Sequence, residues 1–306
     1  MIETRTSAGA AEDARSNEIY NAVWPYDAYS TEDARAFKEA MREADDHLAL
    51  LDGTVAGSAF SAIRPDRPDA VFALVTVLEQ HRRRGVGSAL YDAVSRWSAE
   101  RGRDAIESFV DEDDAASVAF VEKRGFRTIE RYERLTLDLP GVADPSVAPP
   151  DGVELTLWDG TDDLARGMYA VALEAYPDAP GAEEDVVEPF DDWVEHELRR
   201  FEGTGGAMFV ALAGTEVVGW AQLTASAATP GVGRHAFTAV KRDWRGKGVA
   251  GALKRAQIAW AKQAGFEQLV TRNEERNAPM RRVNARLGYR PATARLFVQG
   301  PLSGAV

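Results

Sequence analysis

Arginine and glycine recur at one fixed spacing, Arg-x-x-Gly-x-(Gly or Ala), in two segments of the chain. The spacing is met by Arg82, Gly85 and Gly87 and again by Arg245, Gly248 and Ala250. Each segment follows an apolar run and precedes an amphipathic one, so each predicts a strand, a short loop and a helix. A helix start presents unpaired N–H groups and a partial positive charge, and glycine lets an anion approach the backbone. Because arginine adds direct phosphate contacts, each segment predicts a site for a diphosphate.

The two segments are parts of one internal duplication. Position 82 corresponds to 245 and position 85 to 248, which is a constant offset of 163 residues. The same offset pairs Trp97 with Trp260 and Gly125 with Gly288 without a gap. Neither copy has the Lys-Ser/Thr ending of a P-loop, and neither contains Gly-x-Gly-x-x-Gly. The duplication therefore predicts two domains of one kind, each built around its own anion-binding loop.

Composition limits the functions to consider. The chain has 306 residues, 45% of them hydrophobic, a net charge of −13 and no cysteine. The length suits two domains, and the negative charge disfavours nucleic acid as a partner. Because disulfides and thiolate metal sites are excluded, we expect a reducing compartment and no metal. No apolar run reaches membrane-spanning length and residues 1–10 lack the apolar core of a signal peptide, so we expect a cytoplasmic protein without a membrane partner. The sequence gives no prediction of oligomeric state.

The elements around the first loop follow from apolar patterns and turn residues. Asp52-Gly53 predicts a hairpin between strands at 47–51 and 54–63. Residues 71–78 form a nearly continuous apolar run, as expected of a buried central strand that leads into the loop. The helix after the loop is expected to end at Gly102. The remaining expected elements are a strand at 105–110, a helix at 114–124 and a strand at 131–139.

A proline-rich linker separates the two copies. Residues 140–151 contain four prolines and no periodicity. We expect a first domain at 1–140, a linker at 141–151 and a second domain at 152–306. Antiparallel hairpins followed by strand–helix–strand units predict a mixed α/β fold with a mixed sheet in each domain. The second copy is expected to have strands at 153–158, 236–240, 268–272 and 296–298, helices at 162–176, 191–202, 249–265 and 278–287, and a hairpin across Ala213-Gly214.

This order of elements resembles the GCN5-related N-acetyltransferases, the GNAT superfamily. The resemblance rests on a strand, the Arg-x-x-Gly-x-(Gly/Ala) loop, a helix, a strand, and a short helix that ends in Gly125-Phe126 or Gly288-Tyr289. It covers nearly the whole chain as two tandem domains, an arrangement similar to mycothiol synthase. It implies, in each domain, a mostly antiparallel twisted sheet that is splayed at its central strand and flanked by helices. It also implies that the loop amides hold the pyrophosphate of acetyl-CoA, with the pantetheine arm along the splayed strand.

Carried onto this chain, the resemblance assigns cofactor contacts to the two strand ends, the two loops and one helix start. In the first copy these residues are Val77, Leu78, Arg82, Arg83, Arg84, Gly85, Val86, Gly87 and Ser88. In the second copy they are Val240, Lys241, Arg245, Gly246, Lys247, Gly248, Val249, Ala250, Gly251 and Asn277. Asp114 takes the place of Asn277 in the first copy.

The chain departs from the family at the catalytic positions. Many members carry a tyrosine on the last helix as the acid for the departing thiolate, but the matching residues here are Val121 and Asn284. The glutamate that often serves as base on the central strand is replaced by Val71 and Arg234. His235 is the remaining candidate for the base, although strand alternation puts it out of phase with the family's position unless a bulge intervenes. The alternative is a structural histidine at a strand end.

Other side chains allow two interpretations each. Four aromatic residues of the second copy could line an acceptor pocket or belong to the core: Tyr176, Trp193, Trp220 and Phe237. The acidic runs Asp111–Asp114 and Glu183–Asp185 could steer a cationic amine or be solvated surface.

The predicted function is direct transfer of an acetyl group from acetyl-CoA to the primary amine of a small molecule. The second copy is the better candidate for catalysis because it keeps Asn277. Absence of cysteine removes the commonest covalent nucleophile, which favours direct transfer. Two alternatives stay open at this point: acetylation of a peptide or protein, and a non-catalytic module that binds acyl-CoA.

Overall fold

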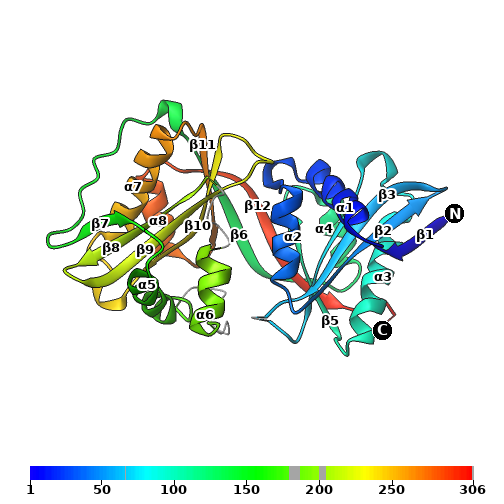
Figure 1. The fold of residues 1–306 in the computed structure, drawn as a ribbon. Helices are drawn as coiled ribbons and strands as arrows, with labels where there is room; N and C mark the ends of the chain where they lie inside the picture. Colours follow the sequence, from blue (N-terminus) through cyan, green and yellow to red (C-terminus); the bar gives the residue numbers. More distant parts are fainter. Residues whose placement is uncertain (66, 179–186, 200–204, 305–306) are drawn as a thin grey trace. The chain divides into compact units, whose positions relative to one another are not determined.

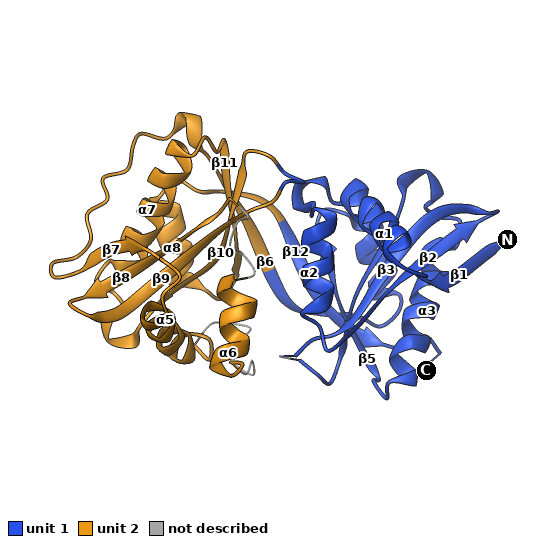
Figure 2. Cartoon of the chain, viewed as in Figure 1, with its two compact units in different colours: residues 1–131, 227–229, 294–306 blue, residues 132–226, 230–293 orange. Residues whose placement is uncertain are grey.

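The computed structural model describes residues 1–65, 67–178, 187–199 and 205–304. The chain forms two compact units, shown in different colours in Figure 2. The first unit comprises residues 1–131, 227–229 and 294–306, and the second comprises residues 132–226 and 230–293.

The first unit is a six-stranded mixed sheet with helices (Figure 1). Its order is β1 (Ile2–Thr6), β2 (Glu43–Leu51), β3 (Thr54–Ile63), β4 (Val71–Val77), β5 (Ala105–Asp111) and β12 (Arg290–Pro301). Neighbouring strands are antiparallel except β4 and β5, which are parallel. The expected hairpin at Asp52-Gly53 is present, with φ of 52° and 83° at these two residues. The helices are α1 (Ala10–Val23), α2 (Thr31–Glu39), α3 (Val86–Glu100) and α4 (Ala115–Glu122).

The second unit repeats this plan. Its order is β6 (Arg127–Asp138), β11 (Gln268–Glu274), β10 (Val232–Val240), β9 (Glu216–Ala225), β8 (Ala207–Ala213) and β7 (Glu154–Leu157). The β10–β11 pair is parallel and the other pairs are antiparallel. The helices are α5 (Asp162–Ala175), α6 (Phe190–Trp193) with a π-helical continuation at Val194–Leu198, α7 (Val249–Gln263) and α8 (Ala278–Arg286). None of the described helices is long and apolar enough to cross a membrane.

The last strand of each repeat completes the sheet of the other repeat. In the first unit β12 pairs with β5, from Arg295 opposite Asp111 to Pro301 opposite Ala105. In the second unit β6 pairs with β11. The compact units therefore divide the chain near residues 131 and 293, whereas the boundaries expected from the sequence repeat fall at 140 and 152. The difference arises because β6 and β12 pair with strands that are distant in sequence, so each belongs to the compact unit of its partner strand.

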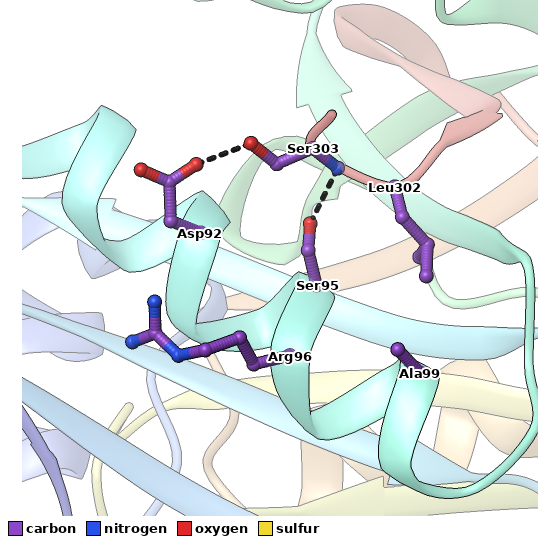
Figure 3. Close-up of a pocket in the computed structure, with 6 residues that line it drawn as sticks. All are labelled: Asp92, Ser95, Arg96, Ala99, Leu302 and Ser303. Carbon is purple, nitrogen blue, oxygen red and sulfur yellow. Dashed lines mark hydrogen bonds between the residues drawn. The ribbon is translucent and has the colours of Figure 1, made fainter. Parts of the chain in front are cut away.

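The C-terminal segment after β12 is fastened to helix α3. Figure 3 shows Ser303 above this helix, with its N–H donating to Ser95 Oγ (2.8 Å) and its hydroxyl donating to Asp92 Oδ1 (2.5 Å). The hydroxyl of Tyr91 donates to the carbonyl of Pro301 over 2.8 Å. These contacts hold the exchanged strand in the first unit.

Each sheet splits next to its central strand, as expected for this fold class. In the described residues β4 and β5 pair only at Val71–Ile106 and Phe72–Glu107. Strands β10 and β11 pair only from Val232–Gln268 to Arg234–Val270. Beyond these residues β4 and β10 continue toward the loops without a parallel partner. The split is therefore the feature that positions the sites.

The four aromatic residues considered for an acceptor pocket lie in or against the core of the second unit. Trp193 and Trp220 pack edge to face at 5.9 Å, and Tyr176 packs on Phe237 at 4.8 Å. Trp193 and Trp220 are fully buried in one apolar cluster with helix α5. The core interpretation of these aromatics is the one that the structure supports.

Candidate functional site

The first loop opens helix α3 with a glycine in the left-handed region. Gly85 is the N-cap with φ of 88°, a conformation that strains any residue with a Cβ. No described side chain caps this helix and its first turn contains no acid, so its leading N–H groups are available to an anion. Arg82 Nε donates to the carbonyl of Val77 at 3.3 Å, and its Nη1 lies 3.4 Å from Asp114. The arginine thus fixes the loop to the end of β4.

The second loop has the same geometry. Gly248 is the N-cap of α7 with φ of 96°, again without a described side-chain cap or an acid in the first turn. Arg245 Nε donates to the carbonyl of Val240 over 3.0 Å, which repeats the contact of the first loop. The two predicted anion sites are therefore built alike, down to the arginine that ties each loop to its strand.

The second loop also carries a carboxylate that the sequence did not indicate. Asp178 accepts hydrogen bonds from Arg242 Nε and Arg245 Nη1, both at 2.7 Å. The hydrogen bonds from Arg242 and then Arg245 hold the pKa of this carboxyl well below its usual range. Asp178 lies more than 60 residues before both arginines, so no local pattern pairs them. An anion at this loop would rely on the helix amides more than on free guanidinium groups.

A cavity of about 490 Å³ extends from the first loop along the split of the first unit. Strands β4 and β5 and helices α3 and α4 contribute its walls. Of the cofactor residues expected in the first copy, Val77, Arg82, Arg83, Gly85, Gly87 and Ser88 line it. Leu78, Arg84 and Val86 do not belong to its lining; Val86 is buried in the core and Arg84 lies 3.8 Å from Asp52. The structure therefore brings most of the first loop together around one hollow.

Five of the positions that line this cavity in the first unit carry buried polar or hydroxylated side chains in the second unit. The offset of 163 residues pairs Tyr91 with Lys254, Val94 with Gln257, Val110 with Asn273, Val121 with Asn284 and Phe126 with Tyr289. All five first-unit residues line the cavity, and all five second-unit residues are buried.

A bulge adds His235 to the polar set. The register of β10 shifts between His235 and Phe237, so the strand holds one extra residue there. As a result Gly233, and not Arg234, pairs with Leu269, just as Val71 pairs with Ile106 in the first unit.

Two residues further along, His235 matches Ala73, which lines the first unit's cavity. The bulge that would bring His235 into phase with the cavity-lining positions is therefore present.

His235, Gln257 and Tyr289 form a hydrogen-bonded chain. His235 Nδ1 lies 2.9 Å from Gln257 Oε1, and because this oxygen only accepts, the imidazole donates there. Burial, and secondly the charge of Lys254, lowers the pKa of His235 well below its ordinary value, so the ring is neutral. Its Nε2 then accepts from the hydroxyl of Tyr289, with which it makes a short contact.

Lys254 lies beside this chain, and no salt bridge joins it to any residue that the structure describes. It is 1% exposed, and its Nζ lies 5.5 Å from the centre of the Tyr289 ring. Burial alone lowers the pKa of Lys254 to about 7. Among the described residues the side-chain amide of Asn284 and Nε2 of Gln257 lack hydrogen-bond partners, although both side chains are fully buried. Unpartnered buried polar groups cost about 1–3 kcal/mol each, and they concentrate at functional sites.

Comparison with known proteins identifies the family. The Acetyltransferase (GNAT) family matches the chain at residues 16–126 and again at 166–289. The chain belongs to the GNAT acetyltransferase family. It is accordingly an acyltransferase with two tandem GNAT regions.

Relatives and solved structures agree with a tandem GNAT protein. The mycothiol acetyltransferase of Actinosynnema mirum is 27% identical over 250 residues, 79% of each chain. The L-2,4-diaminobutyric acid acetyltransferase of Nocardia farcinica is 31% identical over 105 residues, 34% of this chain and 54% of the relative. A tandem GNAT protein from the clavulanic acid biosynthesis pathway, solved without acetyl-CoA, aligns over 100% of both chains with a TM-score of 0.80 at 21% identity. At that identity the structural match shows the fold alone.

Each unit of this GNAT protein caps the helix after its split with an acidic or amide side chain. Asn277 accepts from the N–H of Met280 at 3.2 Å at the start of α8. Asp114 accepts from the N–H groups of Ala116 and Ser117 at the start of α4. Asn277 and Asp114 therefore have the same local role as helix N-caps. Asn277 alone does not show that the second unit is the catalytic one.

Asp111, one of the residues that line the first cavity, is not solvated surface, whereas the acidic run at 183–185 lies outside the described residues. It accepts from Trp24 Nε1 and Arg295 Nε, both at 2.9 Å, and from the hydroxyl of Tyr26. Arg295 is 7% exposed and also donates to Asp27 over 2.9 Å. Arg295 comes from β12, so only the strand exchange brings this cluster together, and sequence reasoning could not find it.

Proposed function

We propose that this GNAT protein transfers the acetyl group of acetyl-CoA directly to the primary amine of a small molecule. The observation that carries the proposal is the repeated helix start, with open amides behind a left-handed glycine and next to a split sheet. The relatives' names refer to mycothiol and to L-2,4-diaminobutyric acid, which supports a small-molecule acceptor for this chain. We also propose the cytoplasm as its compartment, in keeping with a chain free of cysteine.

We assign catalysis to the second unit because titratable groups gather there. The first unit's cavity wall has only Tyr91 and hydrocarbon at the matched positions, whereas the second has His235, Lys254 and Tyr289. General acid–base catalysis needs a positioned group that takes or gives a proton near operating pH. The geometry meets the positioning part of this requirement, because neutral His235 accepts a hydrogen bond from the hydroxyl of Tyr289. Burial lowers the pKa of His235, so it is a weaker base than a free imidazole.

The backbone of β10 supplies the donor for the developing negative charge. The N–H of Lys241 donates to the carbonyl of Val218 on β9 over 2.9 Å. Because successive N–H groups of a strand point to opposite sides, the N–H of Val240 points into the split. We propose that it donates to the thioester oxygen as the amine attacks. The C–N bond then forms and the C–S bond breaks with its electron pair going to sulfur, so CoA leaves as the thiolate. The proton that the amine nitrogen loses passes through the hydroxyl of Tyr289 to Nε2 of His235.

Matched substitutions at the two loops test the assignment. Ser88 and Gly251 are the third residues of α3 and α7, both with ordinary helical backbone, so glutamate is expected to preserve each fold and favour each helix start. A carboxylate there lies next to the proposed diphosphate. Repulsion of about 1.4–4 kcal/mol corresponds to a 10- to 1,000-fold weaker binding of CoA.

The assay is release of the CoA thiol over a panel of amino sugars, amino acids, polyamines and short peptides. We expect Gly251→Glu to lower kcat/KM at least tenfold and Ser88→Glu to keep most activity. The opposite ranking would move catalysis to the first unit. A panel in which no amine accelerates thiol release would contradict the proposed reaction and favour the non-catalytic binding module. A response restricted to peptides would favour the peptide alternative.

A further inference from the structure

The cavity of the first unit penetrates its hydrophobic core. At one end it is lined by the loop residues Arg82, Gly85 and Gly87. Its inner wall includes Val94, Ile106, Val110 and Phe126, which are 0–8% exposed and belong to the core cluster of this unit. A ligand whose diphosphate lies at the loop and whose arm follows the split would therefore end against core hydrocarbon.

Two polar side chains beside the inner wall of this cavity, Tyr91 and Arg124, already have partners. The hydroxyl of Tyr91 donates to the carbonyl of Pro301 over 2.8 Å. Arg124 Nη2 donates to Ser88 Oγ over 2.8 Å, and its guanidinium lies 3.5 Å from the centre of the Phe120 ring. The inner-wall residues have no polar side-chain atoms at all. The inner wall therefore has no hydrogen-bond partner for a polar acyl group, whereas burial of an alkyl chain against it is favourable.

The second unit has the opposite chemistry at the same positions. Gln257 and Asn284 replace Val94 and Val121, and both are fully buried with unpartnered amide atoms among the described residues. An alkyl chain against such groups would leave them without water or a partner, which is costly. At these matched positions the first unit is therefore apolar and the second unit polar.

We infer that the first unit binds CoA thioesters whose acyl group is an alkyl chain longer than acetyl. The inference rests on the proposed function only in taking the loop as a CoA diphosphate site. Each methylene buried in the cavity should lower the dissociation constant about fourfold, until the chain fills the available space. The second unit should gain nothing from added methylenes.

The test isolates the first unit with Gly251→Glu, which blocks the second loop within the full chain. Calorimetric titration of this variant with acetyl-, butanoyl-, hexanoyl- and octanoyl-CoA is expected to show a Kd that falls stepwise with chain length. Val121 is half-buried on α4 and lines the cavity, so its substitution is not expected to unfold the unit. Val121→Phe, which shortens the cavity, and Val121→Asn, which copies the second unit, should each remove the chain-length effect and spare acetyl-CoA.

Three results would overturn the inference. One is an equal Kd for acetyl- and octanoyl-CoA in Gly251→Glu, and another is an unchanged chain-length effect in both Val121 variants. The third is a Gly251→Glu protein that binds no thioester while the unaltered chain binds one; this removes the first unit as a CoA site but leaves the proposed acetyl transfer intact. If neither protein binds any CoA thioester, the proposed function fails as well.

Discussion

Replacing Lys254 by methionine should stabilise the second unit, and the gain should depend on pH. The side chain is 1% exposed, and burial is the only cause acting on its pKa, so no described group compensates its charge. Methionine keeps the length and most of the volume of lysine without the ammonium. The substitution therefore removes a buried charge and leaves the packing nearly as it is.

The size of the effect follows from the two pKa values. The ordinary pKa of this lysine is 10.5, and in the fold it falls to about 7. The unfolded chain keeps the proton up to the higher value and the folded chain only up to the lower one, so stability falls as the pH drops from 10.5 to 7. At about 1.4 kcal/mol for each pH unit, the full penalty below pH 7 is on the order of 5 kcal/mol.

At pH 10 the remaining penalty is only about 1 kcal/mol, because most of the lysine is neutral in the fold and the unfolded chain is close to its own pKa. Lys254→Met should therefore raise the free energy of unfolding by roughly 2–5 kcal/mol at pH 6 and by less than about 1 kcal/mol at pH 10.

Urea unfolding followed by tryptophan fluorescence measures this, because five of the seven tryptophans lie in the second unit. Lys262→Met on the same helix is the control, because this ammonium pairs with Asp144 and its replacement measures the effect of a lysine-to-methionine change where the charge has a partner. A Lys254→Met protein that is less stable than the unaltered chain by the same amount at both pH values would refute the reasoning. It would mean that the buried ammonium has a favourable partner.

Two further substitutions test the polar clusters of the two units. Tyr289→Phe removes the donor to the buried Nε2 of His235, so it should lower kcat about 10- to 100-fold, change the pH profile and cost about 1–3 kcal/mol of stability. An unaltered pH–rate profile would exclude the pair from the chemistry. Arg295→Met leaves Asp27 and Asp111 buried without their shared cation and should cost about 3–5 kcal/mol in the unfolding of the first unit. A cost below about 1 kcal/mol in urea unfolding would show that the carboxylates do not depend on Arg295.

Local features of the fold could be predicted from the sequence because short-range chemistry determines them. The Asp52-Gly53 turn, the continuous apolar run of β4 and the glycine N-caps at 85 and 248 all depend on residues within a few positions of one another. The split beside β4 and β10 followed from the family resemblance, and the strand pairing confirms it.

Long-range partners could not be predicted. The pairing of β12 with β5 joins residues almost 200 positions apart, and no pattern in either strand encodes the choice. Asp111 therefore read as part of a solvated acidic run, although Arg295 and Trp24 bury it. Asp178 was missed for the same reason, since its arginines lie on another element.

One signal in the sequence was available. Lining up the two repeats at the 163-residue offset shows that Val94, Val121 and Phe126 become polar or hydroxylated in the second copy. The structure adds the reason to look there, because these positions surround the first unit's cavity. His235 could not be placed by the offset alone, since the bulge in β10 moves it by one position.

Calorimetric titration with CoA tests the central claim, that each unit holds a diphosphate at an open helix start. We predict two binding sites for the unaltered chain and one for each of Ser88→Glu and Gly251→Glu. A chain that takes up no CoA, or two variants that both keep two sites, would contradict the account.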